Sequence, residues 1–147
     1  MATHTATAQS AIEQAKLSVI AYNEKNWDHA QEALTPDAVY DEVATGRRLE
    51  GHNDILPAWK AWATAFPDSH ATFERELASD NTVTLELRWR GTHKGPLNLP
   101  SGTVEPTGKA MDMRACQVIE VAANGRTGSI RHYFDIATML RQLGVSR

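Results

Sequence analysis

The chain has little cysteine, no long apolar stretch and no excess of positive charge, and each lack excludes a class of protein. Its one cysteine, Cys116, excludes an intrachain disulfide and a metal site built from several thiolates. No stretch approaches the ~18 consecutive apolar residues of a membrane-spanning helix. The N-terminal segment lacks the basic head and apolar run of a signal peptide, so we expect a cytoplasmic protein without a membrane partner.

The charge balance and the spacing of polar residues exclude further classes. Fifteen Lys and Arg against eighteen Asp and Glu give a net charge of -3, which argues against nucleic acid as a partner. The histidines lack metal-binding spacing, so we expect no metal site. The glycines form neither a Walker nor a dinucleotide fingerprint, and no Gly-x-Ser-x-Gly nucleophile elbow occurs. Nucleophilic catalysis is therefore not expected.

What is present is the pattern of one α+β domain over residues 1–147, with disorder expected at 1–8. Apolar spacing predicts helices at 10–25 and 27–34, a strand at 37–43, a third helix between Asp54 and Pro67, strands at 69–78, 81–91, 109–121 and 128–135, and a short helix from Ile136. The stretch 95–108 is rich in Pro and Gly and is expected to be a loop, either a lid or a surface excursion. This order predicts a curved, mainly antiparallel sheet wrapped around about three helices.

Large aromatic side chains mark two of these elements. Trp59, Trp62 and Phe66 share one stripe of the third helix, and Trp89 belongs to the apolar set of the second long strand. These rings either line a cavity for a flat, apolar ligand or simply form the core. Helix and strand positions of Tyr22 and Tyr40 also allow them to reach such a cavity and orient a ligand.

Two titratable groups stand at the ends of apolar strands. Asp135 follows the strand-like run 130–134 and precedes the last helix, and His93 has the strand parity of Val83 and Leu85. An Asp135 enclosed by Phe134, Tyr133 and the tryptophans would be a stronger base than aspartate in water. The alternatives are that Asp135 only caps the helix and that His93 is a loop histidine facing solvent.

Successive side chains of a strand point to opposite faces of the sheet, and this alternation assigns two further polar strand residues to a face. His132 has the opposite parity to Asp135, so we expect it on the outer face of the sheet. Arg114 is a natural partner for an oxyanion or carboxylate if it points inward, and a cross-strand ion pair with Asp112 is the alternative.

Four short stretches, in register along the chain, resemble a known family. They are Ala65-Phe66-Pro67-Asp68, Gly91-Thr92-His93-Lys94-Gly95-Pro96, Pro106-Thr107-Gly108-Lys109, and Tyr133-Phe134-Asp135 with Arg141-Gln142-Leu143-Gly144. Their order is similar to that in SnoaL-like polyketide cyclases, also called ester cyclases, within the nuclear transport factor 2-like superfamily. The resemblance covers roughly residues 12–144.

The resemblance implies a cone-shaped α+β barrel with an internal cavity, and catalysis without metal or organic cofactor. It implies that Asp135 is the general acid/base in an intramolecular aldol closure of a polyketide ester, and that His93 is a pocket group. The chain departs from the family at Val39-Tyr40-Asp41-Glu42, where many relatives carry a histidine, and in the loop segment 100–105. Both departures fall where a pocket mouth is expected, so the family's substrates do not carry over.

Three functions remain open at this point. The first is a cofactor-free cyclase or related acid/base catalyst for a bulky, apolar, aromatic or polyketide-like carbonyl compound, with Asp135 and His93 or Arg114 at its centre. The second is a hydrolase, isomerase or dehydratase, favoured by an Asp135–His93 dyad or by a water-sized gap between polar groups. The third is a non-catalytic binding module, favoured by a cavity under about 100 Å3 and an Asp135 that is exposed or only caps a helix.

A homodimer or homotetramer is also expected. The strand residues Cys116, Val118, Ile130 and Phe134 share one parity and are too apolar for a face in solvent. We expect pairing sheet to sheet, which a ~16 kDa particle in light scattering would contradict.

Overall fold

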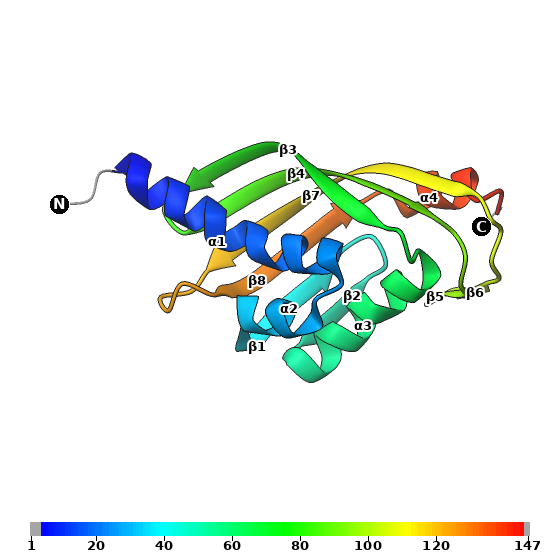
Figure 1. Ribbon diagram of the computed structural model, residues 1–147, viewed down its shortest axis with the longest axis horizontal. Helices are drawn as coiled ribbons and strands as arrows, with labels where there is room; N and C mark the ends of the chain where they lie inside the picture. The colour runs from blue at the N-terminus through cyan, green and yellow to red at the C-terminus, as the bar shows by residue number, and fades with distance from the viewer. Residues whose placement is uncertain (1–3, 146–147) are drawn as a thin grey trace.

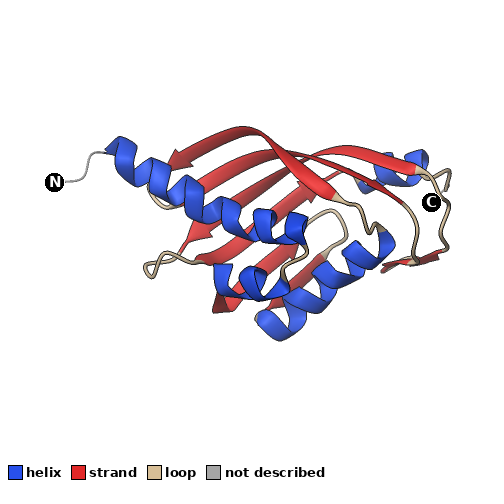
Figure 2. Ribbon diagram, viewed as in Figure 1, coloured by secondary structure: helices blue, strands red, loops and turns tan. Residues whose placement is uncertain are grey.

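The computed structural model describes residues 4–145 and places the three N-terminal helices on one side of a curved sheet (Figures 1 and 2). The helices are α1 (His4–Glu24), α2 (Trp27–Ala33), α3 (His52–Ala65) and α4 (Ile136–Gln142). The strands are β1 (Leu34–Glu42), β2 (Arg47–Glu50), β3 (His70–Ser79), β4 (Thr82–Thr92), β5 (Leu97–Leu99), β6 (Gly102–Val104), β7 (Ala110–Val121) and β8 (Thr127–Phe134). This arrangement confirms the predicted α+β plan.

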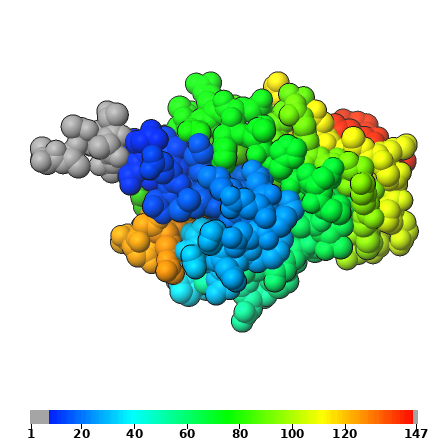
Figure 3. Space-filling model, viewed as in Figure 1, coloured from blue at the N-terminus to red at the C-terminus, as the bar shows by residue number. Residues whose placement is uncertain are grey.

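The main sheet has the strand order β2-β1-β8-β7-β4-β3. Only the β1–β8 pairing is parallel within the described sheet, so the sheet is mainly antiparallel, as predicted. In the space-filling view, atoms of α1, α2 and α3 cover this side of the sheet (Figure 3). The three N-terminal helices therefore cover the concave face, and the interior of the protein lies between the sheet and these helices.

Two element boundaries differ from the prediction. α1 is helical from His4, ahead of the predicted start at residue 10, whereas residues 1–3 of the segment predicted to be disordered lie outside the described residues. β1 begins at Leu34, ahead of the predicted start at residue 37, and contains Pro36. The register of β1 on β8 shifts between Leu34 and Val39, and such an irregularity accommodates a residue that cannot donate to the ladder.

The predicted loop 95–108 contains a hairpin formed by β5 and β6. Leu97 and Val104 are buried, and they pack with Phe66 of the α3 end and with Met139 of α4. Gly102 follows the turn with φ 130°, a conformation that suits glycine. The hairpin is thus a packed cover over one end of the core rather than a surface excursion.

The core divides into two apolar clusters. One joins α1, α2 and α3 to the middle of the sheet, and the other joins the hairpin and α4 to Met111 and Met113. Three half-buried rings, Trp62, Trp89 and Phe134, pack against both clusters. These rings therefore mark the place where the two parts of the core meet.

The register between β7 and β8 decides which residues face the helices. Ile119 pairs with Ile130 and Cys116 with Tyr133, so odd residues of β7 lie opposite even residues of β8 from the Ala115–Phe134 pair to the Glu120–Ser129 pair, after which the register shifts. Since paired residues point to the same side, even residues of β7 face outward while even residues of β8 face inward.

The surface predicted for dimerisation is therefore wrong in part. Ile130 is buried in the core and Phe134 lies on the inner face, whereas only Cys116 and Val118 are half-buried on the outer face. The outer face still carries the exposed ring of Tyr133. Self-association stays a prediction.

Candidate active site

A cavity of about 70 Å3 lies at the junction of the two core clusters. Its wall comprises Ser18, Val19, Tyr22, Tyr40, Trp59, Trp62, Phe66, Ser69, Trp89, Met111, Met113, Gln117, His132 and Phe134. The wall thus includes six of the eight side chains predicted to bind a ligand: Tyr22, Tyr40, Trp59, Trp62, Phe66 and Trp89. Ligand binding itself stays a prediction for these residues.

The wall aromatics hold one another in place by edge contacts. The Tyr22 ring lies 5.3 Å from that of Trp89, and the two rings are almost perpendicular. The Tyr40 ring meets that of Trp59 in the same way at 5.5 Å. Such edge-to-face pairs are favourable beyond their buried area, so the rings are fixed walls rather than loose filling.

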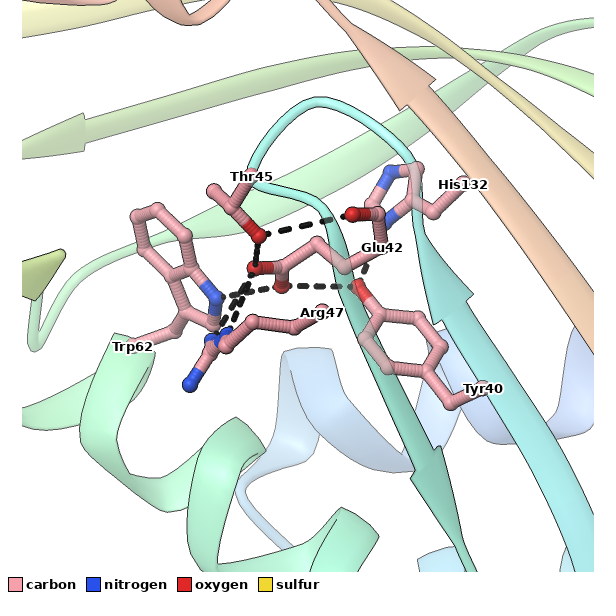
Figure 4. A network of polar contacts seen from close by, with 6 residues as sticks. All are labelled: Tyr40, Glu42, Thr45, Arg47, Trp62 and His132. Carbon is pink, nitrogen blue, oxygen red and sulfur yellow. Dashed lines mark hydrogen bonds and ion pairs between the residues drawn. The ribbon is translucent and has the colours of Figure 1, made fainter. Parts of the chain in front are cut away.

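A buried carboxylate lies behind this wall, as Figure 4 shows. Glu42, at the end of β1, is fully buried. One of its oxygens accepts hydrogen bonds from Thr45 and from the Arg47 guanidinium at 3.0 Å. The other accepts from the Trp62 indole at 2.9 Å and from the Tyr40 hydroxyl at 3.2 Å. Arg47 offsets the charge, and the four donors compensate the carboxylate for its lost water.

His132 continues this network into the cavity. Its Nε2 accepts a hydrogen bond from the Trp89 indole N–H at 3.3 Å, because an indole can only donate. The proton of the neutral ring therefore sits on Nδ1 and is donated to the Tyr40 oxygen at 2.8 Å. The Tyr40 hydroxyl proton is then left for Glu42. The network thus runs in one direction, from Trp89 through His132 and Tyr40 to Glu42.

Burial sets the protonation states of this network. It lowers the pKa of His132 from 6.5 to about 4, against the opposing charge of Glu42. Burial also raises the pKa of Tyr40 well above its usual value, and the Glu42 charge adds to that effect. His132 is therefore a neutral imidazole and Tyr40 a neutral phenol near pH 7.

The buried His132 should make folding stability depend on pH. The unfolded chain takes up this proton near pH 6.5 and the native protein only near pH 4, so protonation favours unfolding in between. We expect His132 to contribute a loss of about 3 kcal/mol in the free energy of unfolding as the pH falls from 7 to 4. Urea denaturation would measure the free energy of unfolding at both pH values. It should not show this loss in the His132→Gln variant, whereas the His70→Gln variant, changed at an exposed site, should still show it. Equal pH dependence in the wild type and His132→Gln would contradict the assignment.

Gln117 lies directly opposite His132 in the β7–β8 ladder. Its side chain is on the inner face, is almost fully buried and lines the cavity. Its amide oxygen has no hydrogen-bond partner within the part of the chain that the structure describes.

On another part of the wall, the Tyr22 and Ser69 hydroxyls bond to each other at 2.7 Å, and burial raises the pKa of Tyr22 to about 12.

Asp135 lies outside the cavity, and its predicted enclosure is wrong. It is exposed and caps α4, where it accepts hydrogen bonds from the Ala137 backbone N–H at 3.0 Å and the Thr138 hydroxyl at 2.8 Å. These bonds, the Thr138 hydroxyl first, lower the pKa of Asp135 instead of raising it. The alternative that Asp135 caps the last helix is confirmed, and its catalytic role is a prediction without support from its surroundings.

His93 is fully buried, so the alternative of a solvent-facing loop histidine is wrong. Its ring stacks on Phe66 at 5.2 Å and its Nδ1 accepts from the Thr107 backbone N–H at 3.2 Å. Burial lowers the pKa of His93. Within residues 4–145 no hydrogen bond joins His93 to Asp135, and neither lines the cavity, so the dyad that would favour a hydrolase, isomerase or dehydratase does not form.

Arg114 and Tyr133 lie on the outer face of the sheet, away from the cavity. The Arg114 side chain is 83% exposed and lies 3.9 Å from Glu74. Asp112, its expected partner, instead makes a two-bond pair with Arg88. Arg114, Tyr133 and Asp135 border an open hollow on the outer face. The reason is again the register: Arg114 is an even residue of β7 and Tyr133 an odd residue of β8.

Glu42 and Gln117 were not predicted from the sequence, and the prediction that His132 lies on the outer face of the sheet is wrong. Tyr40 and Glu42 have the same parity in β1, so the prediction of an inward Tyr40 already implied an inward Glu42. The local signal for an inward His132 was that the apolar Ile130 and Phe134 share its strand face, and this face is the one that the pairing with β7 turns inward.

The described residues contain neither a cluster of metal-binding side chains nor a membrane-spanning helix. Among residues 4–145, His, Cys, Asp and Glu side chains form no group of three that is arranged to hold a metal ion. None of the helices in that range is long and apolar enough to cross a membrane.

Comparisons with known proteins agree with this architecture. A family model described as SnoaL-like polyketide cyclase matches residues 13–143. The sequence has no significant match among curated proteins. A solved structure of a candidate SnoaL-like polyketide cyclase from Jannaschia sp. CCS1 is similar with a TM-score of 0.84 and 15% identity, over 100% of both chains.

Two other solved structures share this fold. IdmH from Streptomyces antibioticus, a candidate polyketide cyclase, has a TM-score of 0.76 and 26% identity, over 92% of this chain and 99% of that one. An LEH-like epoxide hydrolase from M. tuberculosis has a TM-score of 0.71 and 20% identity, over 92% and 90% of the two chains. The same fold thus carries proteins named for different reactions.

Proposed function

Because the chain belongs to the SnoaL-like polyketide cyclase family, we propose that it is an acid/base catalyst that acts on a carbonyl compound in the cavity between sheet and helices. The observation that carries this proposal is His132, a neutral imidazole at the cavity wall that is linked through Tyr40 to the buried Glu42. The reaction class is an aldol closure or a related proton transfer. Its acid/base group is His132 rather than Asp135.

The proposed reaction uses the free electron pair of His132 Nε2. This nitrogen takes a proton from the carbon next to a carbonyl group, and the electrons of the C–H bond form an enolate. The enolate carbon bonds to a second carbonyl carbon, whose oxygen then receives the proton from Nε2 and becomes a hydroxyl. The long hydrogen bond from Trp89 opens in this step, which frees its N–H to donate to the enolate oxygen.

The low pKa of His132 makes it a weak base toward an uncharged ligand. The reaction itself offsets this weakness, because the enolate is a negative charge beside the new imidazolium. Glu42 adds a second negative charge behind Tyr40, and this charge already raises the pKa of His132. The network therefore stabilises the ion pair that proton transfer creates.

The cavity size limits the part of a substrate that is enclosed. About 70 Å3 holds only a few water molecules, or the reacting end of a larger compound. This volume and the capping role of Asp135 are also what the sequence analysis expected of a non-catalytic module. Against that alternative, a core needs no buried carboxylate, and apolar side chains often replace buried ion pairs without loss of stability.

Retro-aldol cleavage tests the proposal and the role of Asp135 together. The β-hydroxyketone 4-hydroxy-4-methyl-2-pentanone breaks into two acetone molecules by the reverse of the proposed steps, which NMR can follow. We expect the wild type to release acetone faster than buffer does. We expect Asp135→Asn to retain this rate within about twofold, because surface positions away from the site have small effects.

Two outcomes would contradict these expectations. Acetone release by the wild type at the buffer rate would count against the catalytic proposal and favour a binding module. Loss of the activity in a folded Asp135→Asn protein would return the acid/base role to Asp135.

A second candidate function is the addition of water to an activated substrate such as an epoxide. It is favoured by the small cavity, which places water-sized space beside Gln117 and His132. It is also consistent with the similar structure of an epoxide hydrolase. With 1,2-epoxybutane in 18O-labelled water, this function predicts a diol that carries one labelled oxygen, whereas the aldol catalyst should leave the epoxide unchanged.

A further inference from the structure

Most polar groups of the cavity wall satisfy one another. Tyr22 bonds to Ser69, Tyr40 to His132 and Glu42, Trp62 to Glu42, and Trp89 to His132. Two polar wall side chains, Ser18 and Gln117, have no hydrogen bond to any other described residue. The hydroxyl of Ser18 is a single small group, whereas the Gln117 carboxamide is a complete donor–acceptor pair.

The unused carboxamide is unusual for its depth. Gln117 is 4% exposed, and its amide oxygen is sealed from solvent without a partner. A buried polar group without a hydrogen bond is unfavourable by far more than a typical hydrogen bond contributes, so such groups are rare without a purpose. His132, its partner in the ladder, already uses both ring nitrogens in hydrogen bonds to Tyr40 and Trp89. A ligand inside the cavity is therefore the natural partner.

The position of Gln117 defines which part of a ligand it meets. Gln117 and His132 are directly paired residues on the same face of β7 and β8, so their side chains start about 5 Å apart. A ligand carbon within reach of His132 therefore has its attached or neighbouring oxygens within reach of the carboxamide. The NH2 group can donate to a carbonyl oxygen, and the amide oxygen can accept only from an O–H or N–H group.

We infer that Gln117 is a specificity-determining residue that selects ligands bearing a hydroxyl group close to the carbonyl group, that is, β-hydroxycarbonyl compounds or their enols. This inference rests on the proposed function for its choice of ligand, because an aldol reaction creates such a hydroxyl. The amide oxygen accepts the hydroxyl proton, and the amide N–H donates to the oxygen of the carbonyl. A ligand that lacks the hydroxyl offers no donor to the amide oxygen.

A matched pair of ligands tests the inference by binding alone. The probes are 4-hydroxy-4-methyl-2-pentanone and 4-methyl-2-pentanone, which differ by the hydroxyl group, and the fluorescence of the wall tryptophans or ligand-observed NMR reports binding. We expect the wild type to bind the hydroxyketone about tenfold more tightly than the ketone. In Gln117→Met, of similar length but without hydrogen bonds, the two dissociation constants should become equal within about twofold.

Two controls separate this role from a structural one. Gln31→Met makes the same change at an exposed position of α2 and should keep the tenfold preference. Gln117→Met should also raise the melting temperature, since it removes an unpaired buried amide, whereas a structural glutamine would lower it. If Gln117→Met does not fold, Gln117→Leu provides the same comparison.

The outcomes are distinct. Equal binding of both probes by the wild type, binding of neither probe because the carboxamide holds only water, or an undiminished preference in the Gln117 variants would each overturn the inference. One further outcome is a wild type that prefers the hydroxyketone, a Gln117→Met variant that loses this preference, and no release of acetone by the wild type. That result would support the inference and contradict the proposed catalysis.

Discussion

The His132→Gln variant is expected to lose about 10²- to 10⁴-fold in the rate of acetone release from 4-hydroxy-4-methyl-2-pentanone. The carboxamide oxygen of glutamine can still accept from the Trp89 indole, but the side chain cannot take up and return a proton at neutral pH. The loss should appear in kcat, because the cavity walls that bind the ligand stay in place. Steady-state NMR kinetics would measure it, with circular dichroism to confirm folding.

The pH profile gives the same prediction a second readout. The wild-type rate should stay high down to about pH 5 and fall only near the His132 pKa of about 4, because the base acts in its neutral form. Tyr40→Phe keeps the ring but removes the hydroxyl that links His132 to Glu42. We therefore expect the pH at which the rate falls on the acid side to shift in this variant. A His132→Gln protein with the wild-type rate would exclude His132 as the acid/base group.

Replacing Glu42 should have the largest effect on stability. In Glu42→Leu, the Trp62 indole, the Tyr40 hydroxyl and the Arg47 guanidinium all lose their acceptor inside the protein. Removing one partner of a buried pair typically lowers the free energy of unfolding by about 3–5 kcal/mol. The lower end applies here, since the Arg47 side chain is 31% exposed and can turn toward water. Urea denaturation with an unchanged slope would measure the loss.

An exposed ion pair provides the control for Glu42. Arg48 and Glu50 lie 3.6 Å apart on β2 with more than half of each side chain in solvent. Glu50→Leu should change the free energy of unfolding by no more than about 0.5 kcal/mol. The double variant Glu42→Leu/Arg47→Leu should recover part of the loss, because no charge is then left without a partner. A Glu42→Leu protein as stable as the wild type would show that the network is not a stabilising centre.

The two expected effects separate two uses of one network. Glu42 and Arg47 lie behind the wall, so their loss acts first on folding. His132 lies on the wall, so its loss acts first on chemistry. Tyr40 joins them and lines the cavity as well, which makes it a positioning residue for His132.

The sequence by itself determined the order of the elements and the aromatic wall. Apolar periodicity located the helices and long strands, since the spacing along one element fixes which of its side chains share a face. Trp59 and Trp62 share one face of α3, Phe66 follows as its C-cap, and all three line the cavity. The parity of β4 likewise placed His93 on the side of Leu85 and Leu87, and all three are buried.

Tertiary structure alone decided which ionisable groups meet inside. The β7–β8 pairing places Gln117 opposite His132, and a shift of one residue would have turned Asp135 and Tyr133 inward instead. Ile130 and Phe134 share the parity of His132, but the packing of Ile119 against Ile130 and of both against the helices decides which face of the strands is buried. The Glu42 network likewise joins residues 90 positions apart, and only folding brings β1 beside β8. Local spacing sets a side chain's face, but pairing between strands sets whether that face is buried.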